Sequence, residues 1–510
     1  MSDRAIRRIV IVGGGTAGWM AAAPLSQRLP RQGPMGCEIV LVESPEIATV
    51  GVGEATIPPI RWYNRSLGLD EAEFTRRTQG TYKLGIEFRN WGRIGHRFFH
   101  GFGDFGPEIE GRSPYWHWLR LKARDPGFPD YEDWSTSSVM ARHMKFTPPR
   151  EGGPKSAHNA YAFAYQFDAW LYAGYLREYA MARGVQRELG MIVDVELRPE
   201  DGFVSAVRLA DGRRIEGDLF VDCSGFRGLL IEGALKAGYE DWRHWLPCDR
   251  ALAVSSERTA PLRPYTSSTA HAPGWQWTIP LQHRTGSGLV YHSDSIGDDE
   301  ASALLLANLE GKPQGTPKPL RFVTGRRKRA WVKNVVAVGL AGGFLEPLES
   351  TSIHLIMDGV GRLLQYFPDR DFHPSLADEF NRRQEIQYQA IRDFIVLHYH
   401  LTERDDSELW RYCRSMKVPD TLAHQIELFR ATGHVVVSDP ESFLEPSWVS
   451  LYLGLGLRPE RLDRFVQQVD EQALLTHFSR LRQAIAGTVA GMPDHAAYIE
   501  QNVRAEPPVA

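Results

Sequence analysis

Two short apolar runs near the start of the chain predict two buried strands with a turn and a helix between them. Residues 8–12 (RIVIV) and 38–42 (EIVLV) are almost wholly apolar, which is typical of strands covered on both faces in a parallel sheet. Between them lie GGGTAG at residues 13–18 and an alanine-rich stretch, which indicate a tight turn followed by a helix. This order predicts a βαβ unit.

The pattern changes twice farther along the chain. Over residues 187–222, short apolar stretches alternate with Asp-Gly turn signals, which predicts a run of hairpin strands. Residues 335–338 (VVAV) predict a third buried strand, which runs directly into a second glycine-rich turn. After about residue 374 the apolar positions recur with helical spacing. One such helix face comprises Ile391, Phe394, Ile395 and His398.

The first glycine-rich turn has the spacing of a dinucleotide-binding fingerprint, G-x-G-x-x-G. Gly13 permits the tight turn, Gly15 lets a pyrophosphate approach the backbone, and Gly18 allows the helix to pack closely on the strand. The helix N-terminus offers unpaired N–H groups to phosphates. Glu43 follows the second strand, where its carboxylate would bind ribose hydroxyls and repel a 2′-phosphate. The sequence therefore predicts a dinucleotide site.

The late strand and turn fit the interleaved FAD domain of aromatic hydroxylases, in which distant segments build one site. No second glycine-rich fingerprint occurs, so the sequence offers no dedicated NAD(P)H domain. The predicted fold class is α/β. It comprises an FAD-binding, GxGxxG, aromatic-hydroxylase-like domain interleaved with a substrate-facing β-sheet over residues 1–373, and a mostly helical, substrate-capping C-terminal region over residues 374–510.

Residues 275–280 (WQWTIP) predict an aromatic strand. Trp275 and Trp277 share one face, and Pro280 cannot donate to a sheet ladder, so it ends the strand or lies at an edge. Two interpretations stay open on the pattern alone. The indoles are either part of an aromatic core strand, or they form a wall beside a flavin, where an ordinary monooxygenase seats its substrate.

Two further segments carry charged groups whose roles the pattern leaves open. Residues 82–88 (YKLGIEF) alternate strictly, which predicts one strand with Lys83 opposite the apolar side chains. On this pattern alone Lys83 is a solvated strand lysine. In residues 344–353 (FLEPLESTSI) two carboxylates precede a helix start. They are either capping residues or part of an anion site at free helix amides.

Together these motifs resemble those of the flavin-dependent tryptophan halogenase family, whose members carry a W-x-W-x-I-P motif beside an FAD fold. Residues 51–58 (GVGEATIP) resemble a segment that lines the family's FAD site, and residues 80–83 (GTYK) resemble the stretch with its reactive lysine. Residues 346–353 (EPLESTSI) follow the family pattern E-P-L-E-S-T-G-I. The resemblance covers nearly the whole chain for FAD binding and catalysis.

The resemblance implies an FADH2-dependent halogenase, an oxidoreductase that uses reduced FAD, O2 and chloride or bromide to make hypohalous acid. The oxidant would pass a tryptophan wall to Lys83, which directs electrophilic halogenation of an electron-rich, indole-type ring with the help of Glu349. A separate NAD(P)H-dependent flavin reductase would supply the reduced FAD. Lys83 would act by hydrogen bonding or as a haloamine, and we favour hydrogen bonding because most lysine side chains are charged at neutral pH.

The resemblance also assigns site residues one by one. The catalytic residues are Lys83 and Glu349, and the halide-binding residues are Thr351 and Ser352. The substrate-binding residues are His100, Phe102 and Trp448. The tunnel wall consists of Trp275, Trp277, Ile279 and Pro280. The FAD-binding residues are Gly13, Gly15, Thr16, Ala17, Gly18, Glu43, Val52, Ala55, Gly339 and Leu340.

The chain departs from the tryptophan-specific members at three places. Ser352 stands where the family has glycine, and its Cβ leaves the choice between chloride and bromide open. His354 stands where the family has an aromatic residue. Members that bind free tryptophan hold it with paired tyrosines and a glutamate, and no Tyr-Tyr pair occurs over residues 431–457. We therefore expect a substrate other than free tryptophan.

Composition bounds the number of domains, the kinds of partner and the cellular location that we expect. The 510 residues are enough for two to four domains, and a net charge of −4 offers no footprint for nucleic acid. The four cysteines lack zinc-site spacing, so we expect reduced thiols, no metal site and a cytoplasmic location. Glycines interrupt the N-terminal apolar run, so we expect neither a signal peptide nor a membrane span.

Two other functions remain compatible with the sequence. A single-component FAD aromatic hydroxylase would share the fold and deliver oxygen from the flavin directly, but the tryptophan motif and the pair of Lys83 and Glu349 argue against it. A non-catalytic protein that stores or senses reduced flavin is the third possibility. Halide-dependent product formation distinguishes a halogenase from both.

Overall fold

The computed structural model describes residues 4–45, 53–150, 152 and 155–506. The chain forms two compact units, each built from three stretches of sequence. Unit 1 comprises Met1–Gln79, Phe167–His244 and Phe322–Tyr388, and unit 2 comprises Gly80–Gln166, Trp245–Arg321 and Gln389–Ala510. The boundary at 388/389 falls inside the long helix α9 (Pro374–His400), whereas the sequence predicted a division at 373/374.

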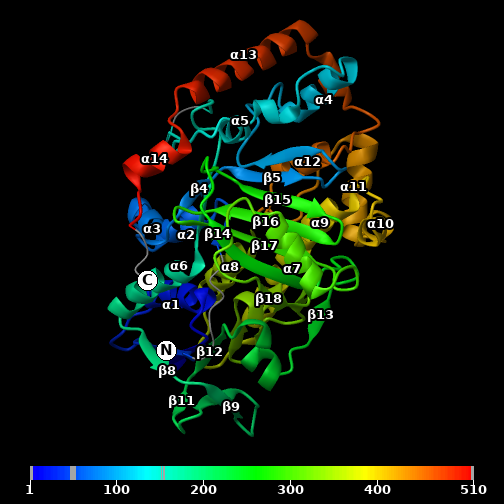
Figure 1. The fold of residues 1–510 in the computed structure, drawn as a ribbon. Helices are drawn as coiled ribbons and strands as arrows, with labels where there is room; N and C mark the ends of the chain where they lie inside the picture. Colours follow the sequence, from blue (N-terminus) through cyan, green and yellow to red (C-terminus); the bar gives the residue numbers. More distant parts are fainter. Residues whose placement is uncertain (1–3, 46–52, 151, 153–154, 507–510) are drawn as a thin grey trace. The chain divides into compact units, whose positions relative to one another are not determined.

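A six-stranded sheet with the order β20-β21-β12-β1-β2-β8 forms the core of unit 1. Two of its strands, β8 and β12, are labelled in Figure 1. The predicted strands at 8–12 and 38–42 are its neighbours β1 and β2, with Val10 opposite Val40. Their apolar runs are buried on both faces, as the uninterrupted pattern predicted. The strands are β1 (Arg8–Val12), β2 (Glu38–Glu43), β8 (Gln186–Leu189), β12 (Leu219–Asp222), β20 (Trp331–Val332) and β21 (Val335–Ala337).

Helices and two small sheets complete unit 1. The helix α1 (Thr16–Arg28) follows the glycine turn and packs against α6 (Ala169–Ala182) and α8 (Ser352–Gln365). The middle of the predicted hairpin run forms the antiparallel sheet of β9 (Ile192–Leu197), β10 (Val204–Leu209) and β11 (Arg214–Glu216). Its two ends are not hairpin strands, because β8 and β12 pair in parallel with β2 and β1 of the six-stranded sheet. The other strands and α-helices that lie wholly in unit 1 are β3 (Gly53–Ala55), β13 (Tyr239–Asp241), β19 (Gly325–Arg327), β22 (Gly343–Phe344), α2 (Ile60–Ser66) and α3 (Glu71–Arg77).

A seven-stranded sheet with the order β18-β14-β17-β16-β15-β5-β6 forms the centre of unit 2. The predicted tryptophan strand is β16, and it is an inner strand, paired with β15 and with β17. Pro280 is its last residue, as predicted. The strands are β5 (Gly85–Arg89), β6 (Arg97–Gly101), β14 (Arg250–Glu257), β15 (Thr266–His271), β16 (Gly274–Pro280), β17 (Arg284–Tyr291) and β18 (Lys318–Arg321).

The single strand predicted over residues 82–88 is wrong. The alternating run divides into β4 (Thr81–Lys83), which pairs with β7 (Ala164–Asp168), and β5, which pairs with β6 and β15. Leu84 lies at the division, where its N–H donates to the carbonyl of Pro264 and its own carbonyl accepts from the N–H of Phe102. Alternation alone cannot reveal this change of partner.

Helices make up most of the chain after residue 374, as predicted, and the four cysteines are free and buried. The helix α7 (Asp298–Ala307) covers β14 and β17 through a cluster that includes Leu252, Leu289 and Leu305. Over the described residues, no helix is both long enough and apolar enough to cross a bilayer. The other helices of unit 2 are α4 (Pro114–Arg124), α5 (Thr136–Arg142), α10 (Glu408–Ser415), α11 (Asp420–Thr432), α12 (Glu445–Gly454), α13 (Glu471–Ala490) and α14 (His495–Asn502).

Candidate active site

The glycine turn of unit 1 has the close contacts that its spacing predicted. Gly13 has a φ of +111°, and a Cβ there would lie 2.3 Å from the carbonyl oxygen of Cys223. A Cβ on Gly18 would lie 1.9 Å from the carbonyl oxygen of Gly13, so the helix packs directly on the turn. At Gly15 an added Cβ would meet no atom within 4 Å. Of the three fingerprint glycines, Gly13 and Gly18 are therefore closely packed, whereas Gly15 is open.

Glu43 lies against this turn from the end of β2. A Cβ on Gly14 would fall 1.4 Å from a carboxylate oxygen of Glu43. The same carboxylate forms an ion pair with Arg187 of β8, a residue that the sequence analysis did not identify. Arg187 lies 144 positions farther along the chain, so no local pattern could reveal it. The acidic residue is thus held at the turn by a cation from the neighbouring strand.

The second glycine-rich turn reaches the same helix. Gly339 has a φ of +68°, and a Cβ there would lie 2.8 Å from the Cβ of Ala17, in the first turn of α1. Leu340 is partly exposed beside it, and Thr16 donates a long hydrogen bond of 3.4 Å to the carbonyl of Ala169. The fold therefore brings two predicted FAD segments together. Ala55 is buried in β3, whereas Val52 lies outside the described residues.

Asp222, at the end of β12, organises the loop that approaches Gly13. Its carboxylate accepts the backbone N–H groups of Ser224, Leu230 and Ile231 at 2.8–3.0 Å. These bonds hold the first turn of a π-helix over Leu229–Ala234. π-Helical turns often occur at functional sites. The apolar pattern predicted a strand here, but it carries no signal for the role of Asp222.

Glu349 is fully buried in a short 3₁₀ helix, Pro347–Glu349, just before α8. Ser350 then adopts a left-handed conformation with a φ of +60°, and Thr351 occupies the N-cap of α8. The Thr351 side chain makes no capping hydrogen bond, and its Oγ1 has no partner among the described residues. The start of the 3₁₀ helix likewise has no side-chain cap, so the interpretation of the two carboxylates as capping residues is wrong. The Nε2 of His354 lies 3.2 Å from the carboxylate of Asp358.

Lys83 is completely buried in β4 of unit 2, so the interpretation as a solvated strand lysine is wrong. Among the described residues it is the only buried lysine. Its Nζ lies 5.3 Å from the centroid of the Phe102 ring, within the range of a cation–π contact. Fully buried lysines are rare in proteins, so this position marks Lys83 as a functional candidate.

The tryptophan strand presents both indoles on one face. The rings of Trp275 and Trp277 are 6.1 Å apart, and Trp275 is buried against Trp91 at 6.3 Å. Gly288 stands opposite Trp277, and a Cβ there would lie 2.1 Å from the Trp277 ring. The glycine therefore leaves the space that the indole occupies. Trp275 is buried, and Trp277, on the same face of the strand, is partly exposed.

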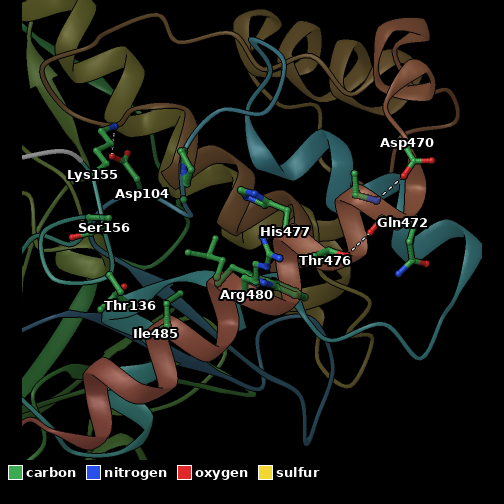
Figure 2. A pocket seen from close by; sticks show the side chains of 18 residues that line it. Asp104, Thr136, Lys155, Ser156, Asp470, Gln472, Thr476, His477, Arg480 and Ile485 are labelled. Carbon is green, nitrogen blue, oxygen red and sulfur yellow. Dashed lines mark hydrogen bonds and ion pairs between the residues drawn. The ribbon is translucent and has the colours of Figure 1, made fainter.

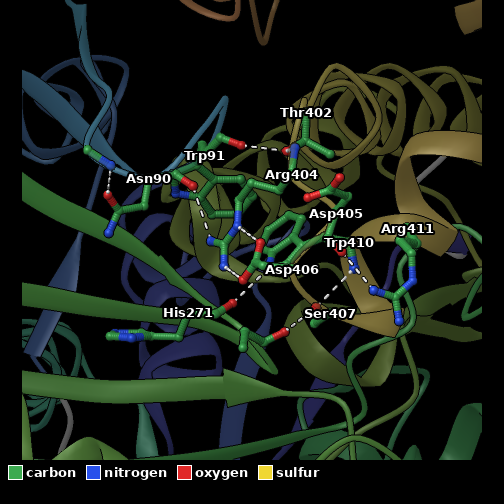
Figure 3. A network of polar contacts seen from close by, with 12 residues as sticks. Asn90, Trp91, His271, Thr402, Arg404, Asp405, Asp406, Ser407, Trp410 and Arg411 are labelled. Atoms are coloured by element: carbon green, nitrogen blue, oxygen red, sulfur yellow. Dashed lines mark hydrogen bonds and ion pairs between the residues drawn. The ribbon is translucent and has the colours of Figure 1, made fainter.

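A network of polar contacts surrounds Trp91 (Figure 3). Arg404 pairs with Asp406 at 2.7 Å, donates to the carbonyl of Asn90 and lies over the Trp410 ring. The hydroxyl of Thr402 donates to the carbonyl of Trp91 at 2.7 Å. A buried guanidinium with this many partners holds the surrounding backbone in one arrangement. The network thus fixes the residue on which Trp275 packs.

The predicted substrate residues lie in one aromatic cluster of unit 2. The ring of His100 is 6.1 Å from Phe102 and 5.8 Å from Phe394, and Trp448 is 4.9 Å from Phe394. Phe443 stacks on Phe394 at 3.8 Å. Phe443 lies within 431–457, where the sequence analysis considered only tyrosines and the tryptophan. The structure therefore brings His100, Phe102 and Trp448 together and adds two phenylalanines.

Comparison with known proteins identifies the family. Residues 8–471 match the protein family described as tryptophan halogenase. The chain belongs to the tryptophan halogenase family. It is an enzyme of the flavin-dependent halogenase type, as the sequence motifs predicted.

Relatives of this halogenase include solved structures and curated enzymes. A flavin-dependent halogenase from Xanthomonas campestris is 43% identical, with a TM-score of 0.95 and coverage of 99% of this chain and 100% of that one. BrvH, a flavin-dependent halogenase from Brevundimonas sp. BAL3, is 46% identical, with a TM-score of 0.92 and coverage of 98% and 99%. Tryptophan 7-halogenase KtzQ from Kutzneria sp. is 34% identical, with coverage of 98% and 99%. The similarity extends over almost the full length of each chain.

Figure 2 shows one cavity of this halogenase with the side chains that line it. It has a volume of about 740 Å³ and lies under one side of α13. Two of the other lining residues, Asp104 and Lys155, form an ion pair at 2.6 Å. The rest, outside α13 and its N-cap, are Gly106, Pro107, Trp134, Thr136, Ser156, Ala157 and Ala160. None of the site residues named from the sequence is among the residues that line it. We assign no role to this cavity.

Proposed function

We propose that this halogenase uses reduced FAD, O2 and chloride or bromide to halogenate an electron-rich, indole-type ring through Lys83. The observation that carries the proposal is the complete burial of Lys83 with its Nζ near the Phe102 ring. A cationic or amine donor in a dry, aromatic environment interacts strongly with a small polar oxidant, because little water competes for it. Neither rival function needs a lysine there.

The residues of unit 1 fit FAD. The open side of Gly15 leaves room for a phosphate beside the first amides of α1, and Glu43 stands at the turn to meet ribose hydroxyls. Thr16, Ala17, Gly18, Ala55, Gly339 and Leu340 would complete the protein side of the site. When bound in its reduced form, FAD would supply the chemistry that turns O2 and halide into hypohalous acid.

Lys83 would hold that acid and direct its halogen. An N–H of the side chain would donate to the oxygen of the oxidant, which makes the halogen more electrophilic toward the ring. His100, Phe102 and Trp448 would orient the ring, and this placement would determine which carbon reacts. Trp277, with Trp275, Ile279 and Pro280, would form the wall past which the oxidant travels.

Glu349 and the start of α8 would supply the remaining groups. The carboxylate of Glu349 would polarise the oxidant or accept the ring proton as the aromatic product forms. The amides of Thr351 and Ser352, at a helix start with no side-chain cap, would bind halide. The Cβ of Ser352 would alter the size of that anion site.

The aromatic cluster supports a substrate other than free tryptophan. Phe443 and Phe394 supply apolar surface in the region where a free amino acid would need polar partners. Indole, or a larger indolic or phenolic ring, would fit such a surface better than a zwitterion. We also propose a separate NAD(P)H-dependent flavin reductase as partner and a cytoplasmic location.

The direct test combines the purified protein, a flavin reductase and NADH with a panel of indoles and phenols, in chloride or in bromide, with products identified by mass spectrometry. The halogenase predicts products that contain halogen and need halide, and negligible NADH oxidation when the reductase is left out. Hydroxylated products without halide, with rapid NADH oxidation by the protein alone, would support the aromatic hydroxylase. Flavin binding with no product would support the flavin-storage protein.

A further inference from the structure

The strand that carries Lys83 is only three residues long. β4 pairs with β7 through Thr81, Tyr82 and Lys83, opposite Gln166, Tyr165 and Ala164. The backbone of residues 80–82 is also contacted by the side chains of His495 and Gln282. A strand of three residues holds its own position poorly, because it forms few ladder hydrogen bonds. The position of Lys83 therefore depends on the groups that contact residues 80–82.

His495, at the start of α14, bonds the backbone next to Lys83. The N–H of Tyr82 donates to the Nε2 of His495 at 3.2 Å. The Nδ1 of His495 lies 2.9 Å from the carbonyl oxygen of Leu262, so this nitrogen carries the proton and the ring is neutral. His495 is fully buried. It replaces, with one side chain, the acceptor that a neighbouring strand would supply.

Gln282 connects Gly80, the residue before β4, to the C-terminal segment through hydrogen bonds. Its side-chain N–H group donates to the carbonyl of Gly80 at 2.7 Å and to the carbonyl of Val503 at 3.1 Å. Its side-chain oxygen accepts the N–H of Ala505 at 2.8 Å. One glutamine side chain thus joins the residue before β4 to two residues of the C-terminal segment.

Aromatic packing adds a third contact. The Tyr82 ring stacks on Phe146 at 4.0 Å and meets Tyr498 of α14 edge-on at 5.6 Å. Tyr498 also contacts Phe146 at 5.2 Å, so the three rings pack on one another. Tyr82 and Lys83 are adjacent and point to opposite sides of the strand. A shift of the Tyr82 ring therefore shifts the backbone of Lys83.

We propose that the C-terminal segment 495–505 is a positioning device for Lys83, acting through His495, Tyr498 and the bridge made by Gln282. His495 and Gln282 are positioning residues: they hold the backbone from which the lysine extends. The segment lies beyond residue 471, where the family match ends, whereas Gln282 lies within the matched range. The inference rests on the proposed role of Lys83. Misplacement of a reacting group by about 1 Å costs on the order of 10²-fold in rate, so a modest shift has a measurable effect.

The test compares four variants with the wild-type protein under the reductase-coupled assay. His495→Leu removes the acceptor for Tyr82, and His495→Gln keeps an acceptor near the same place. Gln282→Leu removes the bridge from a partly exposed position, where folding is less at risk than at His495. Arg504→Gln is the matched control, because Arg504 belongs to the same segment but forms an exposed pair with Glu500. Each is measured for FAD content, reduced-flavin oxidation, aryl halide, and hypohalous acid trapped by a soluble acceptor.

The inference predicts that His495→Leu and Gln282→Leu lose about 10-fold in aryl halide per reduced FAD, while trapped hypohalous acid rises and flavin oxidation stays normal. His495→Gln recovers part of the loss, and Arg504→Gln behaves as wild type. A merely structural defect would lower all four measurements together, and that result overturns the inference. A wild-type yield of aryl halide in both His495→Leu and Gln282→Leu also overturns it. If His495→Leu does not fold, the result for Gln282→Leu alone tests the positioning role. Full activity of Lys83→Ala would instead refute the proposed function, so the two failures are distinguishable.

Discussion

The hydroxyl of Thr81 donates a 2.7 Å hydrogen bond to the carbonyl oxygen of Pro280. It also accepts a hydrogen bond of 2.9 Å from the side chain of Gln166. Thr81 immediately precedes the Tyr82-Lys83 pair, and Pro280 ends the tryptophan strand, so one hydroxyl joins two motifs that are 199 positions apart. Within unit 2, the lysine strand and the tryptophan strand are therefore fixed to each other at this point.

Thr81→Val tests that connection. Valine has the shape of threonine without the hydroxyl, so the carbonyl of Pro280 and the amide of Gln166 both lose a buried partner. We expect the free energy of unfolding to fall by about 1–3 kcal/mol, the usual cost of leaving buried polar groups unsatisfied. Urea denaturation of the variant beside the wild type measures it. An unchanged midpoint and slope would show that the bond adds nothing to stability.

Glu349→Gln keeps the size of a fully buried side chain and removes its charge. If Glu349 acts as an acid or base in halogenation, kcat should fall by on the order of 10²-fold. The FAD content should stay near normal, because the variant retains the shape of the site. Steady-state rates of aryl halide formation provide the measurement. If the kcat of Glu349→Gln equals that of the wild type, the role of Glu349 is purely structural.

Stability should depend on pH through His495. Burial lowers the pKa of this imidazole from 6.5 to about 4, and nearby Arg258 lowers it as well, against the bond to the Leu262 carbonyl. Because the folded protein disfavours the charged ring, the unfolded state binds the proton first. The contribution of the neutral ring is fully present above pH 6.5 and is lost as the pH falls toward 4, a change of about 3 kcal/mol.

His495→Gln is the control for this dependence, since glutamine does not titrate. The wild type should lose stability more steeply than His495→Gln between pH 6.5 and 4, and denaturation curves at several pH values measure the difference. Equal slopes in the two proteins would mean that His495 is not held neutral.

Several elements of the fold follow from local pattern. The first βαβ unit has apolar runs, a glycine turn and a helix in immediate succession, so neighbouring residues alone determine it. The tight contacts at Gly13 and Gly18 were foreseeable for the same reason, because only glycine allows such close backbone approach. The tryptophan strand was also predicted, since its alternation and terminal proline both lie within a few residues.

Features that depend on distant segments could not be predicted. The division between β4 and β5 arises because Leu84 bonds Pro264 and Phe102, and strict alternation continues through it. Lys83 is fully buried with its Nζ near the ring of Phe102, a residue that lies outside its own strand. The bond from Tyr82 to His495 spans 413 positions, and the ion pair between Glu43 and Arg187 depends on the order of strands in a sheet. No spacing rule within one segment contains such information.

Free tryptophan should be a poorer substrate than indole. The cluster around Phe394 and Phe443 offers ring contacts, whereas burial of an ammonium and a carboxylate without partners is costly. We expect kcat/KM for indole to exceed that for tryptophan in both chloride and bromide. Competition between the two substrates in one reaction, read by mass spectrometry, gives this ratio directly. A preference for tryptophan at every halide concentration would contradict the assignment of residues 431–457.

The measurement that tests the account most directly is aryl halide formation by Lys83→Ala, with reduced flavin supplied by a reductase. The account predicts loss of aryl halide while FAD content and reduced-flavin oxidation stay near the wild-type values, because Lys83 acts on the oxidant after it has formed. FAD content and unfolding midpoint are measured on the same sample, so that misfolding is recognised. Aryl halide formation by a folded Lys83→Ala at the wild-type rate would contradict the account.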